Sequence, residues 1–361
     1  MTEQQLRVGV VGTGWAGEAH INAFRQQPGV VVTAIADPRA SRLAELAAKY
    51  QLDHTYTDYK DLIARDDLDI ISVATPNYLH APVAVAALDS GRHVLCEKPL
   101  AHTLADAEAM VRAAMRAGRV LEVAFNHRQR GDVQVLKAHI DQGGLGRVYH
   151  AKATWMRRNG IPGMGGWFTT RAMAGGGPLI DLGVHVLDMA LYLLGEPEVT
   201  AVSAATYAEL GPRGRGGRGD SAGQSAYDVE DLATAFVRLA GGITLLLEAS
   251  WAAYGRHGDD FGVALYGTDG GADIEIVNYG WQDTLRIYGD TGGAPSVTRP
   301  QVRKGTGHEG VIRDFLAVIR GGDWSAHAGV AALRRSQIIE ACYRSAEAGR
   351  ELALTDVALK L

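Results

Sequence analysis

Cysteine is scarce in this sequence of 361 residues. Only Cys96 and Cys342 occur, far apart and without the spacing of metal ligands. We expect both to be reduced, buried thiols rather than parts of a disulfide framework. The sequence also lacks an apolar run long enough to span a membrane, and it begins without the basic and apolar segments of a secretory leader. These absences lead us to expect a cytoplasmic protein.

A strong charge imbalance is missing too. Lysine and arginine number 36 against 41 acidic residues, a formal net charge of -5. This charge is too mild to indicate a nucleic-acid partner or a membrane surface. Internal repeats are absent, and 361 residues suffice for two domains. Glycine, by contrast, is abundant at 45 residues, and its positions are informative.

The first third of the chain alternates short apolar runs with amphipathic helical patterns. Strands are expected at 6–12, 30–37, 69–75, 93–99 and 119–126. Helices are expected between them at 16–27, 40–50, 59–64, 81–90 and 105–117. Continuous apolar strands separated by helices predict an α/β domain of the doubly wound Rossmann type, with a parallel sheet, over residues 1–127.

The remainder, residues 128–361, has a different pattern. Strands are expected at 149–155, 199–210, 232–254, 262–278 and 282–289, and helices at 133–142, 310–320 and 329–349. Glycine pairs at Gly241-Gly242 and Gly270-Gly271 indicate hairpins between strands. The pattern predicts an α+β domain with a large, mainly antiparallel open sheet, whose closing helices can return to the first domain.

One segment, Gly211 to Asp228, is rich in glycine, arginine and serine and has no apolar periodicity. Its low hydrophobicity favours a mobile surface loop. Binding to an anionic group or to a neighbouring subunit is the alternative.

The stretch "VGVVGTGWAG" holds a glycine motif formed by Gly12, Gly14 and Gly17. It follows an expected strand and opens an expected helix, as in sites that bind the pyrophosphate of a dinucleotide. Asp37 ends the next strand, where an acidic residue accepts hydrogen bonds from the adenosine ribose. A carboxylate there favours NAD over NADP, although Arg39 and Arg42 are near enough in sequence to accommodate a 2'-phosphate.

Polar residues also end later strands of the same sheet. Ligands of open α/β sheets bind outside the carboxyl ends of the strands, so these residues should face the same crevice as the glycine motif. Lys98, followed by a proline, is a candidate acid/base or hydrogen-bond donor there, or else a surface lysine at a strand end. Its neighbour Glu97 is expected to contact the cofactor or to have a structural role.

The stretch "AGGGPLIDLGVHVLDMALYLLG" runs from three glycines into an apolar helix. Asp181 and His185 are four residues apart and therefore share a face of that helix. Imidazole titrates near neutrality, which makes His185 a candidate general base. Asp188 on the same face is expected to be structural. The alternatives are a hydrogen-bonded core histidine or a metal site; two ligands without a third cluster lead us to expect no metal.

Four motifs in this order, "GVVGTGWAGEAHINAF", "TPNYLH", "EKPL" and the glycine-led helix, make the chain resemble the glucose-fructose oxidoreductase / inositol dehydrogenase (Gfo/Idh/MocA) family over nearly its full length. The resemblance implies a Rossmann domain, a second domain whose open sheet forms homodimers or homotetramers, and a Lys-Pro peptide that is often cis. It also implies an enzyme that oxidises a secondary alcohol of a sugar, glycoside or inositol. It places Lys98, Asp181 and His185 in the catalytic site.

The expected activity is therefore that of an NAD-dependent dehydrogenase. His185 would be the base, Asp181 would orient the substrate, and Lys98 would hold the reacting oxygen. Residues expected to bind the cofactor are Gly12, Thr13, Gly14, Trp15, Ala16, Gly17, Asp37, Thr75, Pro76, Asn77, His80, Glu97, Lys98 and Asn126. Residues expected to bind the substrate are Lys98, Arg128, Arg157, Trp167, Asp181 and His185. The alternatives are an enzyme that retains NAD and cleaves or epimerises a sugar through transient oxidation, and a non-catalytic nucleotide-binding protein.

Overall fold

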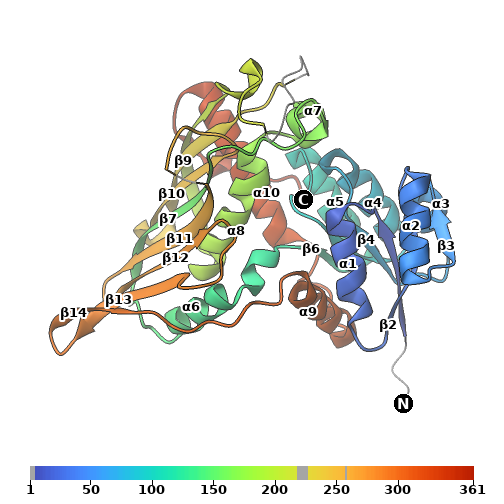
Figure 1. Cartoon of the computed structure of the whole chain (residues 1–361), viewed down its shortest axis with the longest axis horizontal. Helices are drawn as coiled ribbons and strands as arrows, with labels where there is room; N and C mark the ends of the chain where they lie inside the picture. Colours follow the sequence, from blue (N-terminus) through green and yellow to red (C-terminus); the bar gives the residue numbers. More distant parts are fainter. Residues whose placement is uncertain (1–4, 218–226, 257) are drawn as a thin grey trace. The chain divides into compact units, whose positions relative to one another are not determined.

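The computed structural model of the chain describes residues 5–217, 227–256 and 258–361. The chain divides into two compact units. The first comprises the chain as far as Asn126 together with Thr306–Ser336 and Lys360–Leu361. The second comprises His127–Gly305 and Gln337–Leu359. Each unit has its own β-sheet (Figure 1).

The sheet of the first unit has six parallel strands in the order β3-β2-β1-β4-β5-β6, which confirms the predicted doubly wound sheet. The strands are β1 (Leu6–Val11), β2 (Val30–Ala36), β3 (His54–Tyr56), β4 (Ile70–Val73), β5 (His93–Cys96) and β6 (Leu121–Val123). The helices between them are α1 (Trp15–Arg25), α2 (Ala40–Tyr50), α3 (Tyr59–Ile63), α4 (His80–Asp89) and α5 (Leu104–Ala117). A later helix, α9 (His308–Gly321), belongs to the same unit.

Alternate residues of β1 divide the helices between the two faces of this sheet. Val8 and Val10 belong to a buried cluster with residues of α1, α2 and α9, including Phe24 and Phe315. Gly9 faces the other way, where a side chain would meet Leu62 of α3. Helices therefore cover both faces, as continuous apolar strands require.

The sheet of the second unit has nine strands in the order β14-β13-β12-β11-β7-β10-β9-β8-β15. They are β7 (Val148–Arg157), β8 (Val199–Tyr207), β9 (Leu232–Leu239), β10 (Thr244–Ser250), β11 (Asp259–Gly267), β12 (Gly271–Val277), β13 (Leu285–Thr291), β14 (Ala294–Thr298) and β15 (Leu352–Ala353). Only β7 and β10 pair in parallel. The predicted mainly antiparallel sheet and both glycine hairpins are confirmed.

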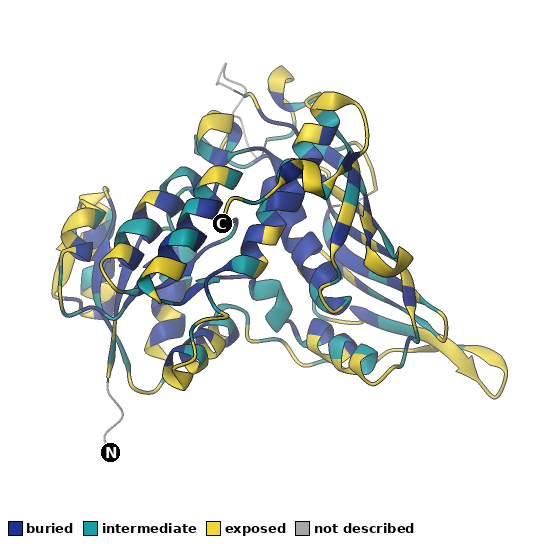
Figure 2. Ribbon diagram, turned by 180° about the vertical axis from the view of Figure 1, so that it is seen from behind, coloured by how far each residue is buried: buried dark blue, intermediate teal, exposed yellow. Residues whose placement is uncertain are grey.

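Helices cover one face of this second sheet. Leu245 of β10 lies beside Ala151 of β7 in the register, and both are fully buried. They point toward the side covered by α6 (Gly131–Asp141) and α8 (Val184–Leu193). On the opposite face, Leu246 and Tyr266 are among the exposed large hydrophobic residues. Exposed residues also dominate the β13–β14 hairpin, drawn in yellow in Figure 2.

Two further predictions concern cysteine and the membrane. Cys96 and Cys342 are free and buried, as predicted. Burial raises the pKa of Cys342 to about 12, so this thiol stays protonated. Among the residues that the structure describes, no helix is long and apolar enough to cross a membrane.

Candidate functional site

The glycine motif lies where β1 ends and α1 begins. Gly12 has φ of +88°, and a Cβ there would lie 2.3 Å from the carbonyl oxygen of Ala74. A Cβ on Gly17 would lie 1.9 Å from the carbonyl oxygen of Gly12. Gly14, just before α1, has open space where its side chain would be. These are the three requirements of a pyrophosphate cradle at a helix N-terminus: a tight turn, close helix packing and free approach to the backbone.

Two predicted cofactor-binding residues have buried polar atoms that lack a partner. The hydroxyl oxygen of Thr75 and Oδ1 of Asn126 make no hydrogen bond to any described residue. Buried polar atoms are rarely left unpaired, so these two, which follow β4 and β6 at the carboxyl ends of the strands, fit a polar ligand. Of the other predicted residues of this group, Thr13, Trp15 and Ala16 lie between β1 and the first turn of α1, and Pro76 and Asn77 follow Thr75 after β4.

Asp37, directly after β2, is buried and heavily hydrogen-bonded. Its carboxylate accepts from the backbone N–H and the hydroxyl of Thr13, at 2.9 and 2.7 Å. It also accepts from Nε and Nη2 of Arg39, at 2.8 and 2.9 Å. Burial alone would raise the pKa of Asp37, but the hydrogen bonds from Arg39 and Thr13 outweigh it and hold that pKa well below its ordinary value. The carboxylate is thus charged, as recognition of ribose hydroxyls requires.

The other arginine considered for a 2'-phosphate, Arg42, is engaged elsewhere. Its guanidinium donates to Glu18 at 2.5 Å, to Glu45 at 2.7 Å and to the carbonyl oxygen of Thr13 at 3.0 Å. It therefore ties the glycine loop to α1 and α2. Of the two arginines, Arg39 has the mostly exposed side chain. It is therefore the arginine that remains as a candidate to contact a 2'-phosphate.

His80 is buried, and its two ring nitrogens lie 2.8 and 2.9 Å from the carbonyl oxygens of Pro99 and Thr75. Burial lowers its pKa. In these contacts His80 joins the loops after β4 and β5, and its predicted contact with the cofactor stays a prediction.

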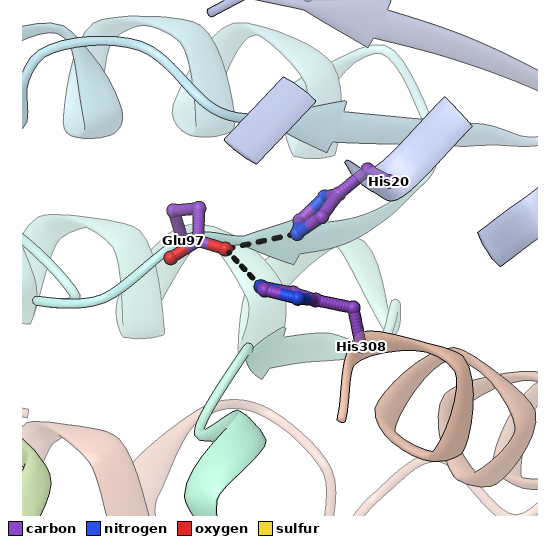
Figure 3. Close-up of side chains that lie close together, drawn as sticks. All are labelled: His20, Glu97 and His308. Carbon is purple, nitrogen blue, oxygen red and sulfur yellow. Dashed lines mark hydrogen bonds and ion pairs between the residues drawn. The ribbon is translucent and has the colours of Figure 1, made fainter. Parts of the chain in front are cut away.

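Glu97 is the centre of a buried cluster that sequence reasoning missed (Figure 3). Its Oε1 lies 3.0 Å from Nε2 of His20 on α1 and 3.0 Å from Nε2 of His308 on α9. Its Oε2 accepts the backbone N–H of Lys98 at 3.2 Å. Burial would raise the pKa of Glu97, but the two histidines hold it well below its usual range. Glu97 thus fixes the backbone where Lys98 begins, and the Lys98-Pro99 peptide is cis, as the resemblance implied.

The same three side chains are of the kinds that bind divalent metals, and their ligand atoms lie within 4.8 Å of one another. Hydrogen bonds already join the carboxylate oxygen to both imidazoles, and Ser72 lies 2.7 Å from the remaining nitrogen of His20. These contacts give each ring a partner without an ion. The absence of a metal cofactor stays a prediction.

In the second unit, the glycine-led helix begins with a π-helical turn, Leu179–Gly183, that continues into α8. A Cβ on Gly176 would lie 2.0 Å from the hydroxyl of Tyr343, and one on Gly177 would lie 2.0 Å from the carbonyl oxygen of Glu230. The buried Glu230 carboxylate accepts the N–H groups of Gly177 and Leu179, at 2.9 and 3.1 Å. It also accepts the Tyr343 hydroxyl at 2.8 Å. The glycines thus let the backbone approach an acidic residue that binds the start of the helix.

This helix start positions the two predicted catalytic residues of the second unit. Asp181 lies in the π-helical turn, and its Oδ2 accepts Nε1–H of the fully buried Trp251 at 2.8 Å. His185, in the first turn of α8, is 8% exposed. Its ring centroid lies 4.7 Å from that of His127 and 5.5 Å from that of Trp155. Both side chains are therefore held in fixed orientations.

The predicted substrate-binding residues of this unit have varied contacts. Arg128 forms a two-pronged ion pair with the buried Asp188, with N–O distances of 2.8 and 2.5 Å, so Asp188 is structural as expected. Trp167 stacks on Phe168, with ring centroids 3.8 Å apart. Arg157 lies at the end of β7 and pairs with Asp259 at 2.9 Å. The substrate contacts of Arg128, Trp167 and Arg157 stay predictions. The predicted loop at 211–228 lies in part, at 218–226, outside the described residues.

Comparison with known proteins gives an independent view of this arrangement. Residues 6–125 match the model of the oxidoreductase family with an NAD-binding Rossmann fold, and residues 133–273 match that of the GFO/IDH/MocA C-terminal domain. The chain is 31% identical to D-glucoside 3-dehydrogenase of Escherichia coli over 98% of this chain and 99% of that protein. It is 32% identical to levoglucosan dehydrogenase of Pseudarthrobacter phenanthrenivorans over 79% and 76%.

A solved levoglucosan dehydrogenase in complex with NADH and levoglucosan has the same fold. It superposes with a TM-score of 0.85 at 28% identity, covering 97% of this chain and 100% of that one. The coenzyme cradle, the two-unit fold and the full-length similarity agree with one another. The chain belongs to the Gfo/Idh/MocA family of oxidoreductases with an NAD-binding Rossmann domain.

Proposed function

We propose that this enzyme is an NAD-dependent dehydrogenase that oxidises a secondary alcohol of a sugar, glycoside or inositol. The observation that carries the proposal is the rigid placement of Asp181 and His185 on one helix start, in a chain that also has a dinucleotide cradle. Relatives named D-glucoside 3-dehydrogenase and levoglucosan dehydrogenase support a neutral carbohydrate as the substrate.

The proposed mechanism assigns roles to three side chains. His185 accepts the hydroxyl proton of the alcohol as the C–H bond breaks. Asp181, held by Trp251, orients the alcohol and shares in the proton relay. Lys98, whose backbone is held by Glu97, donates a hydrogen bond to the reacting oxygen and stabilises its developing negative charge. When bound, NAD supplies the acceptor for the hydride that leaves the carbon.

A panel of monosaccharides, glycosides and inositols with NAD and with NADP tests the activity through the absorbance of the reduced coenzyme. We expect turnover on at least one neutral carbohydrate with NAD. Retention of NAD after denaturing purification steps, with sugar conversion but no net NADH, would instead indicate an enzyme that works by transient oxidation.

Replacing His185 with alanine tests the general base. We expect kcat to fall about 10²- to 10⁴-fold, with the affinity for NAD unchanged. His54→Ala is the matched control, because His54 is an exposed histidine on β3. Wild-type turnover in His185→Ala would remove His185 from the mechanism.

We further propose that the protein works in the cytoplasm as a homodimer or homotetramer formed through the second sheet. Its two free, buried thiols suit a reducing compartment. The uncovered face of the sheet exposes Leu246, Tyr266 and Tyr288, and large apolar side chains exposed on one face are a feature of interfaces. Light scattering should give a lower molar mass for Leu246→Glu than for the wild type, because the substitution weakens the interface. Met115→Glu, on exposed surface of α5, should keep the wild-type mass; a monomeric wild type would contradict the proposal.

A further inference from the structure

Tyr279 has a backbone conformation that tyrosine rarely adopts. It follows β12, and both Asn278 and Tyr279 have positive φ angles, +47° and +60°. For a residue with a side chain this left-handed region costs about 1–2 kcal/mol. The conformation is held because Asn278 exchanges hydrogen bonds with the backbone of Asp259, each 3.1 Å long. Such strain persists where the surrounding structure imposes it, and it concentrates at functional sites.

The held conformation brings the Tyr279 hydroxyl to Arg157. Nη2 of Arg157 donates to Oη of Tyr279 at 3.0 Å. A guanidinium only donates, so the tyrosine oxygen is the acceptor and its own O–H proton points away from Arg157. Tyr279 is 49% exposed, whereas the side chain of Arg157 is only 13% exposed. The phenol is therefore the accessible end of a buried polar chain.

Asp259 completes this chain and connects it to the predicted catalytic residues. Its Oδ2 pairs with Nε of Arg157 at 2.9 Å, and its Oδ1 accepts Nε1–H of Trp155 at 2.8 Å. The indole of Trp155 in turn lies beside His185, with ring centroids 5.5 Å apart. The rings of Tyr279 and Trp155 are also in contact, with centroids 6.2 Å apart, so a single side chain separates Tyr279 from the proposed base within one unit.

Electrostatic interactions also connect Tyr279 and Arg157 to Asp181. Burial is the main cause that raises the pKa of Tyr279; Arg157 lowers it, and the carboxylates of Asp259 and Asp181 raise it further. Burial alone would lower the pKa of Arg157, whereas Tyr279, Asp259 and Asp181 raise it. Asp181 therefore lies within electrostatic reach of both side chains, the phenol stays protonated, and the guanidinium stays charged.

We propose that Tyr279 is a specificity-determining residue that donates its O–H to one hydroxyl of an uncharged carbohydrate substrate, with Arg157 as the residue that orients it. This inference rests on the proposed function. A hydroxyl fits better than a carboxylate, because Asp259 already balances the charge of Arg157 and Asp181 adds a second negative charge nearby. A carboxylate on the substrate would be repelled by both.

Tyr279→Phe removes only the hydroxyl and tests the role. With the best neutral sugar of the wild-type panel, we expect kcat/KM to fall about 10- to 100-fold, mostly through KM for the sugar. The KM for NAD should not change. Tyr149→Phe is the matched control, because Tyr149 is an exposed tyrosine near the start of β7 in the same sheet.

Monodeoxy derivatives of that sugar identify the contact. For one derivative, the wild type and Tyr279→Phe should have equal kcat/KM. That derivative lacks the sugar hydroxyl that the tyrosine contacts, so the tyrosine hydroxyl has no partner to lose. Equal kcat/KM of the two enzymes on the parent sugar would overturn the role of Tyr279. The same loss on every deoxy derivative would also overturn it, since the effect would then not depend on a hydroxyl.

Calorimetric binding of the sugars to the enzyme–NADH complex separates this inference from the proposed function. If Tyr279→Phe weakens the binding of the parent sugar but not that of one deoxy derivative, this result supports the contact. If the wild type also fails to oxidise any sugar, the dehydrogenase activity is contradicted while the contact stands. Turnover and binding that are both unaffected by the substitution contradict only the role of Tyr279. A wild type that neither binds nor oxidises any carbohydrate contradicts both.

Discussion

At the scale of single residues, the carboxylate of Asp37 has competing partners. Thr13 and Arg39 give it five hydrogen bonds, which is more than the about four lone-pair directions of a carboxylate. A ribose hydroxyl therefore gains its best geometry when the exposed side chain of Arg39 moves aside. The freed guanidinium is also the cation that a 2'-phosphate would need. The two residues should consequently act on coenzyme choice in opposite directions.

We expect Asp37→Ala to weaken NAD binding and to lower the ratio of kcat/KM with NAD to kcat/KM with NADP at least 10-fold, from the loss of a charged hydrogen-bond acceptor. Arg39→Ala should raise the same ratio about threefold or more, because a charge-assisted contact to phosphate is lost. Initial rates with both coenzymes measure the ratio, and melting temperatures check that both variants fold. A shift of both ratios in one direction would refute the assignment.

The residues that sequence reasoning found and missed differ in one physical respect. The glycine motif and Asp37 lie on consecutive elements, so spacing along the chain predicts their proximity. His308 lies 211 residues after Glu97, and only the return of α9 to the first unit joins them. No local pattern contains that information. The same holds for Glu230, which accepts an N–H at the start of the glycine-led helix from 51 residues away.

At the scale of elements, apolar periodicity predicted the long helices and buried strands and missed the short exposed strands. Helix α2 has the predicted bounds, 40–50, since its buried face repeats at helical spacing. By contrast, β3 has three residues and β15 has two, too few to show alternation. β14 is missed because it is almost wholly exposed. Its place in the sheet comes from backbone pairing with β13, which residue type does not reveal.

The glycines before α8 show how residue type can depend on contacts from distant parts of the chain. The described contacts of Gly176 and Gly177 are with Tyr343 and Glu230. The glycines are needed because a Cβ at these positions would clash with Tyr343 or with Glu230, whose carboxylate accepts the first N–H groups of the helix.

At the scale of the whole molecule, the buried side chain of His93 makes stability depend on pH in mild acid. His93 of β5 accepts the N–H of Val120 at 3.1 Å, and its ring meets the edge of Trp324. Burial, with a smaller contribution from Arg119, lowers its pKa from 6.5 to about 4. The folded protein therefore keeps His93 neutral while the unfolded chain takes up a proton below about pH 6.5. Stability is lost as the pH falls from about 6.5 toward 4.

Replacing His93 with asparagine should remove this part of the pH dependence. The amide oxygen can still accept the Val120 N–H, but it does not titrate. Between pH 7.5 and pH 5 we expect the wild type to lose about 2 kcal/mol through His93, seen as a lower melting temperature, and the variant to lose less. His54→Ala, at an exposed position, should keep the wild-type slope. Equal slopes in His93→Asn and the wild type would show that the buried imidazole is not what couples folding to pH, because a group that titrates alike in both states contributes nothing to that slope.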